Sequence, residues 1–125
     1  MLTLRYKPLW IAVSVVLVLT VIWGSLQTSY GVKAPHGFDK VEHFSTYMFL
    51  SVWFTGLVHR LRYWVAVFGL LCMGLAMEFT QWAMATGRTA DPYDMAANTC
   101  GVLAGLLLAL LLTGGWAQRV EAWMQ

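Results

Sequence analysis

Four apolar stretches dominate this chain, and each is close to the length that crosses a lipid bilayer. A membrane-spanning α-helix needs about 20 mostly apolar residues. The stretches cover residues 9–26, 43–58, 63–85 and 95–112. Of the 125 residues, 59% are hydrophobic and 11% are charged, whereas soluble domains carry about 25% charged residues. The sequence therefore predicts an all-α membrane protein, a bundle of four transmembrane helices in one domain over residues 1–125.

The first stretch follows Arg5 and Lys7, a pattern that also begins secretory signals. We expect a retained helix, because the apolar run exceeds the roughly 7–15 residues of a signal core and no Ala-x-Ala site follows. Five of the eight Lys and Arg residues lie on the side of the termini and the link at residues 59–62, and three lie opposite. Since cytoplasmic loops are enriched in Lys and Arg, both termini are expected in the cytoplasm.

A carboxylate interrupts the third apolar stretch at Glu78. An ionisable residue at such a depth is costly in a membrane, so it usually has a function or an ionic partner. Gln81 lies about one turn later on the same helical face. In the predicted topology both side chains lie towards the outer end of their helix. Glu78 is therefore the first candidate for a functional residue.

Polar residues of the second and fourth stretches are expected at the same end. Asp39, His43 and Tyr47 follow one another at intervals of four residues and share one helical face. Asp94 and Asn98 are also four residues apart. Three helices would thus present polar faces to one another, which predicts a pocket. The alternative is interhelical hydrogen bonding without a further function, worth about 0.6 kcal/mol for each bond.

This set of residues suggests acid–base chemistry on an anionic substrate. His43 can act as a general acid or base, with an aspartate fixing its tautomer, and Glu78 can exchange protons. The catalytic candidates are therefore His43, Glu78 and Asp94. Lys40 either extends towards the headgroups or binds an anion, and Arg88 suits a phosphate or carboxylate. The substrate-binding candidates are Asp39, Lys40, Tyr47, Gln81, Arg88 and Asn98.

Several functional classes lack support in the sequence. There is no H-E-x-x-H motif, so we predict no metal and no cofactor, although a site held by His43, Glu78 and an aspartate is conceivable. There is no G-x-S-x-G motif and no cysteine paired with the histidine, which argues against a nucleophilic hydrolase. A net charge of +2 does not indicate a nucleic-acid partner. Both an enzyme and a non-enzymatic binding protein remain open.

At these residues the chain resembles the VanZ-like family of bacterial membrane proteins. The resemblance covers residues 38–112. Its motifs are Asp39-Lys40-Val-Glu-His43-Phe-Ser-Thr-Tyr47, Glu78-Phe-Thr-Gln81, Gly87-Arg88 and Asp94-Met-Ala-Ala-Asn98-Thr-Cys-Gly101. Asp91 also precedes the fourth stretch, but Asp94 is preferred for the acidic position because it lies four residues before Asn98.

The resemblance implies a small multi-pass protein of the cell inner (cytoplasmic) membrane. Its expected partners are membrane lipids and a lipid-linked envelope substrate or a glycopeptide. The namesake of the family is linked to resistance to the glycopeptide teicoplanin, so antibiotic resistance is one implied role. The resemblance rests on the order and spacing of these motifs. Such a resemblance does not specify a reaction.

Small and aromatic residues predict how the helices pack. Gly101 and Gly105 form a G-x-x-x-G pattern, which permits close helix contact within one chain or in a homo-oligomer. Tryptophans near the predicted helix ends suit the aromatic belt at the membrane interface. They are Trp10, Trp23, Trp64, Trp82, Trp116 and Trp123.

Overall fold

The computed structural model describes residues 1–27, 37–84 and 91–124. Every regular element in these residues is helical. The helices are α1 (Lys7–Leu26), α2 (Phe38–Leu57), α3 (Tyr63–Ala83), α4 (Pro92–Leu108) and α5 (Trp116–Trp123). A short 3-10 turn, η1 (Arg60–Arg62), precedes α3, and a π-helical turn, η2 (Ala109–Thr113), extends α4. The all-α prediction is confirmed.

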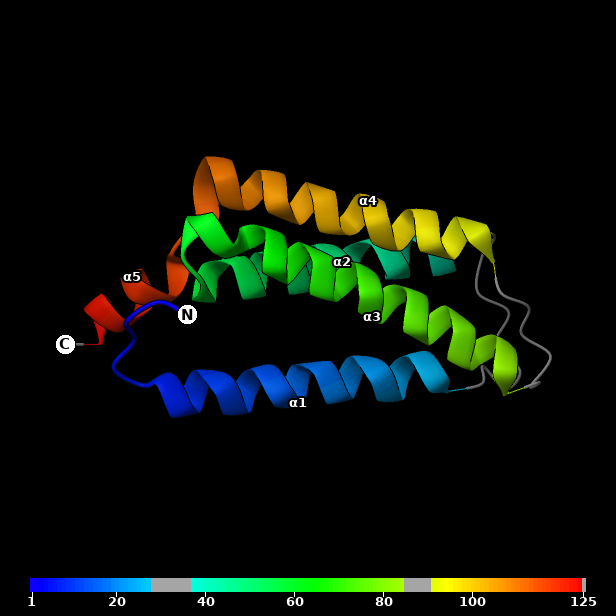
Figure 1. Cartoon of the computed structure of the whole chain (residues 1–125), viewed down its shortest axis with the longest axis horizontal. Helices are drawn as coiled ribbons and strands as arrows, with labels where there is room; N and C mark the ends of the chain where they lie inside the picture. The colour runs from blue at the N-terminus through cyan, green and yellow to red at the C-terminus, as the bar shows by residue number, and fades with distance from the viewer. Residues whose placement is uncertain (28–36, 85–90, 125) are drawn as a thin grey trace.

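The four long helices lie side by side and alternate in direction (Figure 1). The chain ends, η1 and α5 lie at one end of the bundle, and the ends of α1 and α3 and the starts of α2 and α4 lie at the other. This alternation follows from the short link between α2 and α3, because a short connection forces neighbouring helices to run antiparallel. The predicted positions of Asp39, Glu78 and Asp94 at a common end are thereby explained.

Length and apolarity identify three of the four predicted membrane spans. The qualifying helices among the described residues are Lys7–Leu26, Arg60–Ala83 and Pro92–Thr113. The helix α2 is not among them, since three charged residues occupy its first two turns. It packs against α1, α3, α4 and α5. Its buried face includes the polar residues Ser51 and Thr55, which also lower its mean hydropathy.

The closest helix contact joins α2 and α4, and the G-x-x-x-G pattern forms it. A Cβ atom on Gly101 would lie 2.3 Å from the carbonyl oxygen of Phe44, and one on Gly105 would lie 2.5 Å from that of Met48. The hydroxyl of Ser51 donates a 2.8 Å hydrogen bond across this contact. The predicted close packing is therefore confirmed within one chain.

The chain termini form a polar and aromatic clasp that was not predicted. The Glu121 carboxylate of α5 accepts hydrogen bonds from the backbone N–H groups of Arg5 (2.7 Å) and Tyr6 (2.9 Å) and from Trp10 Nε1 (2.8 Å). It thereby satisfies free donors at the start of α1. Burial raises the pKa of Glu121, but the hydrogen bonds from Tyr6, Trp10 and Arg5 outweigh that effect and lower it.

Two tryptophans depart from the predicted interfacial belt. The rings of Trp10, Trp53 and Trp116 pack together with centroids 5.0–5.9 Å apart, and Trp10 is buried. The clasp with α5 draws Trp10 and Trp116 inward. Four others remain exposed, as a belt requires: Trp23, Trp64, Trp82 and Trp123.

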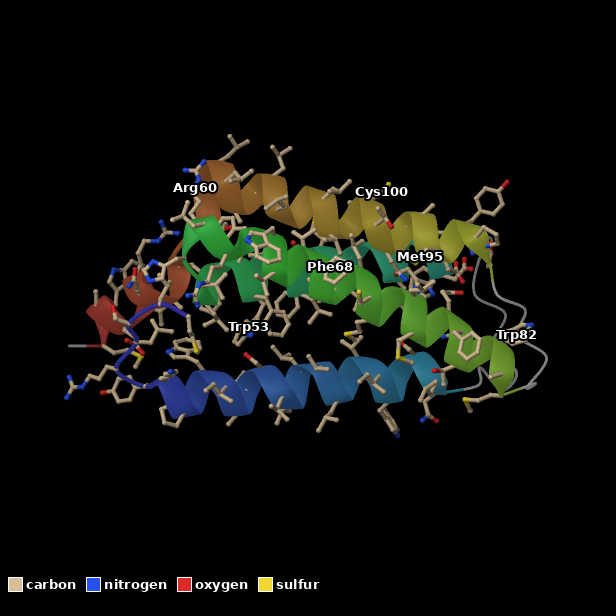
Figure 2. All side chains as sticks on the ribbon, in the orientation of Figure 1. Trp53, Arg60, Phe68, Trp82, Met95 and Cys100 are labelled. Carbon is tan, nitrogen blue, oxygen red and sulfur yellow. The ribbon has the colours of Figure 1, made fainter. Side chains whose placement is uncertain are left out.

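The distribution of polar atoms along the bundle matches a membrane environment. Figure 2 shows nitrogen and oxygen atoms gathered towards the two ends, while mainly carbon covers the middle of the helices. Large apolar side chains are exposed on α1, α3 and α4, among them Leu19, Phe68 and Leu107. Such extensive apolar exposure is unfavourable in water and natural in lipid.

Candidate functional site

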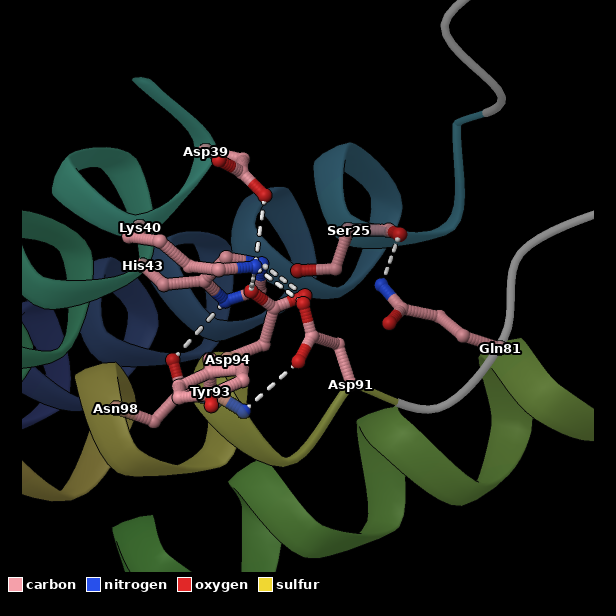
Figure 3. A network of polar contacts seen from close by, with 9 residues as sticks. All are labelled: Ser25, Asp39, Lys40, His43, Gln81, Asp91, Tyr93, Asp94 and Asn98. Carbon is pink, nitrogen blue, oxygen red and sulfur yellow. Dashed lines mark hydrogen bonds and ion pairs between the residues drawn. The ribbon is translucent and has the colours of Figure 1, made fainter. Parts of the chain in front are cut away.

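Lys40 is the centre of an ionic cluster at the end of the bundle opposite the termini (Figure 3). Its ammonium contacts Asp39 Oδ2 at 2.8 Å and Asp91 Oδ2 at 2.6 Å, and it also contacts Asp94 Oδ1. The contacts with Asp91 and Asp94 join α2 to the start of α4. The positive charge of Lys40 is thus shared among three carboxylates of its own chain. The two roles predicted for Lys40, a headgroup contact or an anion contact, did not include these ion pairs.

Asp91 positions the start of α4. It is the N-cap residue, and its Oδ1 accepts a 2.8 Å hydrogen bond from the backbone N–H of Tyr93. Pro92 follows at the first helical position, where its missing N–H costs nothing. The Lys40 ammonium holds the pKa of the Asp91 carboxyl below its usual range, and the Tyr93 N–H lowers it further. Asp91 is therefore the cap residue of α4, and Asp94 faces α2 instead of capping the helix.

His43 of α2 contacts α4 through both ring nitrogens. Its Nδ1 lies 3.0 Å from Asn98 Oδ1, and its Nε2 lies 3.6 Å from Asp94 Oδ2. Asn98 is 2% exposed and Asp94 is 8% exposed. Because Asp94 and Asn98 are one turn apart on α4, they meet the two sides of one imidazole ring. The i, i+4 spacing read from the sequence thus corresponds to a real contact face.

Glu78 completes the group from α3. It is 7% exposed. One possible ligand atom from each of His43, Glu78 and Asp94 lies within 4.8 Å of the other two. These three residues come from α2, α3 and α4, so only the folded bundle brings them together. The three catalytic candidates from the sequence therefore form one cluster.

Tyr47 lies one turn below His43 and is buried, with 3% exposure. Its hydroxyl oxygen has no hydrogen-bond partner among the described residues, and it interacts electrostatically with Glu78. Gly74 of α3 allows this close approach, since a Cβ there would lie 3.4 Å from both the Tyr47 hydroxyl and Asn98 Nδ2. The place of Gly74 in this site was not predicted from the sequence.

Gln81 connects α3 to α1 at the edge of this cluster. Its Nε2 donates a 2.7 Å hydrogen bond to the backbone carbonyl of Ser25 (Figure 3). A cavity of about 120 Å³ lies beside this bond and is lined by nine residues, including His43, Tyr47 and Gln81. Gln81 therefore has an interhelical role and also borders a space next to the ionisable residues.

One candidate lies outside the described residues, and another was underestimated. Arg88 falls within residues 85–90, which lie outside the described part of the chain. Asp91 ranked behind Asp94 in the sequence analysis, yet it caps α4 and binds Lys40. The Asp91-Pro92 pair is a helix-start signal that predicts this capping role.

The electrostatic character of the described site is acidic. Lys40 is surrounded by three carboxylates, and Glu78 adds a fourth beside His43. Closely spaced carboxylates attract positive charge and favour a shared proton or cation. The arrangement can therefore transfer protons through His43 and Glu78 or hold a cation between them.

The comparisons with known proteins add one finding. No curated protein and no solved structure matches the chain. The model of the VanZ/LLP1 family matches residues 5–113, which is most of the sequence and includes every residue of the ionisable cluster. The suspected resemblance is confirmed, and this chain is a member of the VanZ/LLP1 family.

Proposed function

We propose that this VanZ/LLP1 protein binds and acts on a lipid-linked or other anionic envelope substrate at the outer face of the bacterial inner membrane. The observation that carries the proposal is the convergence of His43, Glu78 and Asp94 from three different helices. Assembling ionisable groups in a low-dielectric bundle costs desolvation energy that hydrophobic residues of similar volume would avoid. Function is therefore the better explanation for this cluster than packing.

The proposed topology has four crossings with both termini in the cytoplasm. Because α1 and α3 run in the same direction, the chain between them must return across the membrane (Figure 1). The 20 residues of α2 measure about 30 Å at 1.5 Å per residue, which is the thickness of the hydrocarbon core. The basic residues Arg60 and Arg62 lie at the same end as the termini, as a cytoplasmic location favours.

In this proposal His43, Glu78 and Asp94 supply the acid–base chemistry, either by transferring protons themselves or by activating a water molecule, and Asn98 fixes the orientation of the imidazole. An anionic substrate needs positive charge beyond Lys40, whose ammonium is already shared among aspartates. Arg88 precedes Asp91 by three residues in the sequence and is the candidate for such a contact. Teicoplanin resistance in this member is a further expectation that follows from family membership alone.

The decisive experiment compares envelope lipids in a deletion strain and in strains carrying variants. We expect an anionic lipid-linked species to accumulate on deletion and to return to normal with the wild-type gene. Glu78→Gln keeps side-chain size but removes ionisation, so it should not restore the lipid profile. Gly69→Ala is the matched control on α3, because nothing lies within 4 Å of a Cβ there. Teicoplanin susceptibility is measured in the same strains.

The second candidate is a binding protein whose polar residues hold the helices together. It is favoured by the bond between Gln81 and the Ser25 carbonyl and by the ion pairs of Lys40. This alternative gains if Glu78→Gln restores the lipid profile, or if the variant fails to accumulate in the membrane. Substituted cysteines at position 88 and in the η1 turn test the topology, and labelling of position 88 from the cytoplasm would contradict it.

A further inference from the structure

We propose that His43, Glu78 and Asp94 together bind one divalent transition-metal ion. One ligand atom of each residue lies within 4.8 Å of the other two. Metal–ligand bonds of about 2.0–2.2 Å place the ligands of a tetrahedral site about 3.3–3.6 Å apart. Small side-chain rotations therefore bring the three groups to a common metal ion. One imidazole and two carboxylates form a ligand set that suits Zn²⁺ or Mn²⁺.

The tautomer of His43 supports this assignment. The amide oxygen of Asn98 can only accept a hydrogen bond, so Nδ1, at 3.0 Å from it, carries the ring hydrogen of the neutral imidazole. The lone pair is then on Nε2, which faces Asp94 Oδ2 at 3.6 Å. Two electron-pair donors face each other there and require a proton or a metal ion between them. A carbonyl oxygen behind the opposite ring nitrogen is the usual support of a metal-binding histidine.

Tyr47 provides an independent indication of a ligand. Its side chain is buried, and its hydroxyl has no hydrogen-bond partner among the described residues although it lies close enough to Glu78 to interact electrostatically. Buried hydroxyl groups are almost always hydrogen-bonded to protein or to ordered water. The adjoining cavity of about 120 Å³ is lined by Tyr47 and His43 and has room for a few water molecules. A metal-bound water is a suitable partner, because it can donate a hydrogen bond to the phenol oxygen.

The neighbouring acidic cluster is a less suitable metal site. Carboxylate oxygens of Asp39, Asp91 and Asp94 also lie within 4.8 Å of one another, but the Lys40 ammonium contacts all three. Asp94 belongs to both groups, since Oδ1 contacts Lys40 and Oδ2 faces His43. The ammonium therefore occupies the cluster of Asp39, Asp91 and Asp94. It also fixes the orientation of the Asp94 carboxylate.

A metal ion would supply the positive charge that an acidic site needs in order to bind an anionic substrate. Open coordination positions can take a water molecule and a phosphoryl or carboxylate oxygen, and the ion then acts as a Lewis acid. This role in substrate binding rests on the proposed function. The presence of the metal does not, because binding is measurable on the protein without any substrate.

The test uses the full-length chain, purified without a polyhistidine tag, stripped with EDTA and dialysed against ZnCl₂ or MnCl₂. We expect about one metal ion per chain by mass spectrometry of the metal content. Glu78→Gln and His43→Gln should each weaken binding more than tenfold, since even the loss of a group that supports a ligand costs tenfold or more. Asp91→Asn is the matched control. It removes one carboxylate charge from the Lys40 cluster and should bind like the wild type.

A second measurement covers the case in which a variant does not fold. Co²⁺ bound to the wild type should give visible absorption bands that Zn²⁺ abolishes by competition. The proposal is overturned if the wild type binds neither Zn²⁺ nor Mn²⁺ stoichiometrically, or if Asp91→Asn loses binding while Glu78→Gln keeps it. Normal metal binding together with an unchanged lipid profile on deletion would instead contradict the proposed function alone.

Discussion

Changing Gly101 to alanine should force α2 and α4 apart and destabilise the protein. The added Cβ would lie 2.3 Å from the Phe44 carbonyl oxygen and 3.0 Å from the Met48 nitrogen. Carbon–oxygen contacts between backbones are normally about 3.3–3.6 Å. The two helices must therefore separate by about 1 Å. Both nearest atoms belong to helical backbone, which cannot rotate away as a side chain can.

The cost of this substitution can be estimated from the geometry. Overpacking in a well-packed interior usually costs about 1–3 kcal/mol. Alanine recovers about 0.8–1.0 kcal/mol of that through its higher helix propensity. Because the clash involves backbone on both helices, we expect a net loss of about 2 kcal/mol in the free energy of unfolding. The same separation stretches the 3.0 Å contact between His43 and Asn98, so the site is disturbed as well.

The measurement is unfolding by SDS in mixed micelles, followed by tryptophan fluorescence. Gly69→Ala on α3 is the control, since a Cβ there meets nothing within 4 Å, and it should stabilise the protein slightly. The reasoning is refuted if the two variants differ by less than about 0.5 kcal/mol, the level at which substitutions away from specific contacts usually fall.

Three further predictions concern the polar contacts. Glu121→Ala removes the acceptor of two backbone hydrogen bonds, so the amides of Arg5 and Tyr6 should exchange with deuterium faster; unchanged protection would contradict the clasp. The pKa of Glu121 is lowered in the folded protein. The stabilising effect of this carboxylate is therefore complete above the ordinary glutamate pKa range and is lost as the pH falls through the folded-state pKa. Acid titration of Glu121→Gln should show a weaker loss of stability than the wild type. Lys40→Met leaves the mostly buried Asp94 without its ammonium and should cost about 1–3 kcal/mol in SDS unfolding, between the values for exposed and buried ion pairs; a neutral result would show that solvent screens the cluster.

The helices were predictable from the sequence because apolar length and helix-start residues act locally. The predicted third span, 63–85, corresponds to α3 at Tyr63–Ala83, and the predicted fourth corresponds to α4 with its π-helical extension. The amphipathic α5 was not predicted, since eight residues are too few for a clear pattern. Its stability comes from tertiary contacts of Glu121 and Trp116 with segments far away in the sequence.

The catalytic candidates were also predictable as a group, but the partners of each were not. Intervals of four residues correctly placed Asp94 and Asn98 on one face. The interpretation of Lys40 as a headgroup or anion contact missed its aspartate partners, because a sequence does not state which charges meet across helices. Asp91 was ranked second because Asp94, and not Asp91, lies four residues before Asn98, although the capping role of Asp91 is a local signal.

The sequence by itself determined that this chain is helical and membrane-like, and that the residues of the candidate site lie near one end of the bundle. Those properties depend on the length and spacing of the apolar residues and on the free-energy cost of placing a charge in lipid. Neither depends on which helices are neighbours. The tertiary structure decided that Gly101 lets α2 approach α4 and that Lys40 contacts three aspartates. It also brought Glu78 within a few ångströms of His43, because residues of different helices come that close only when the helices pack together.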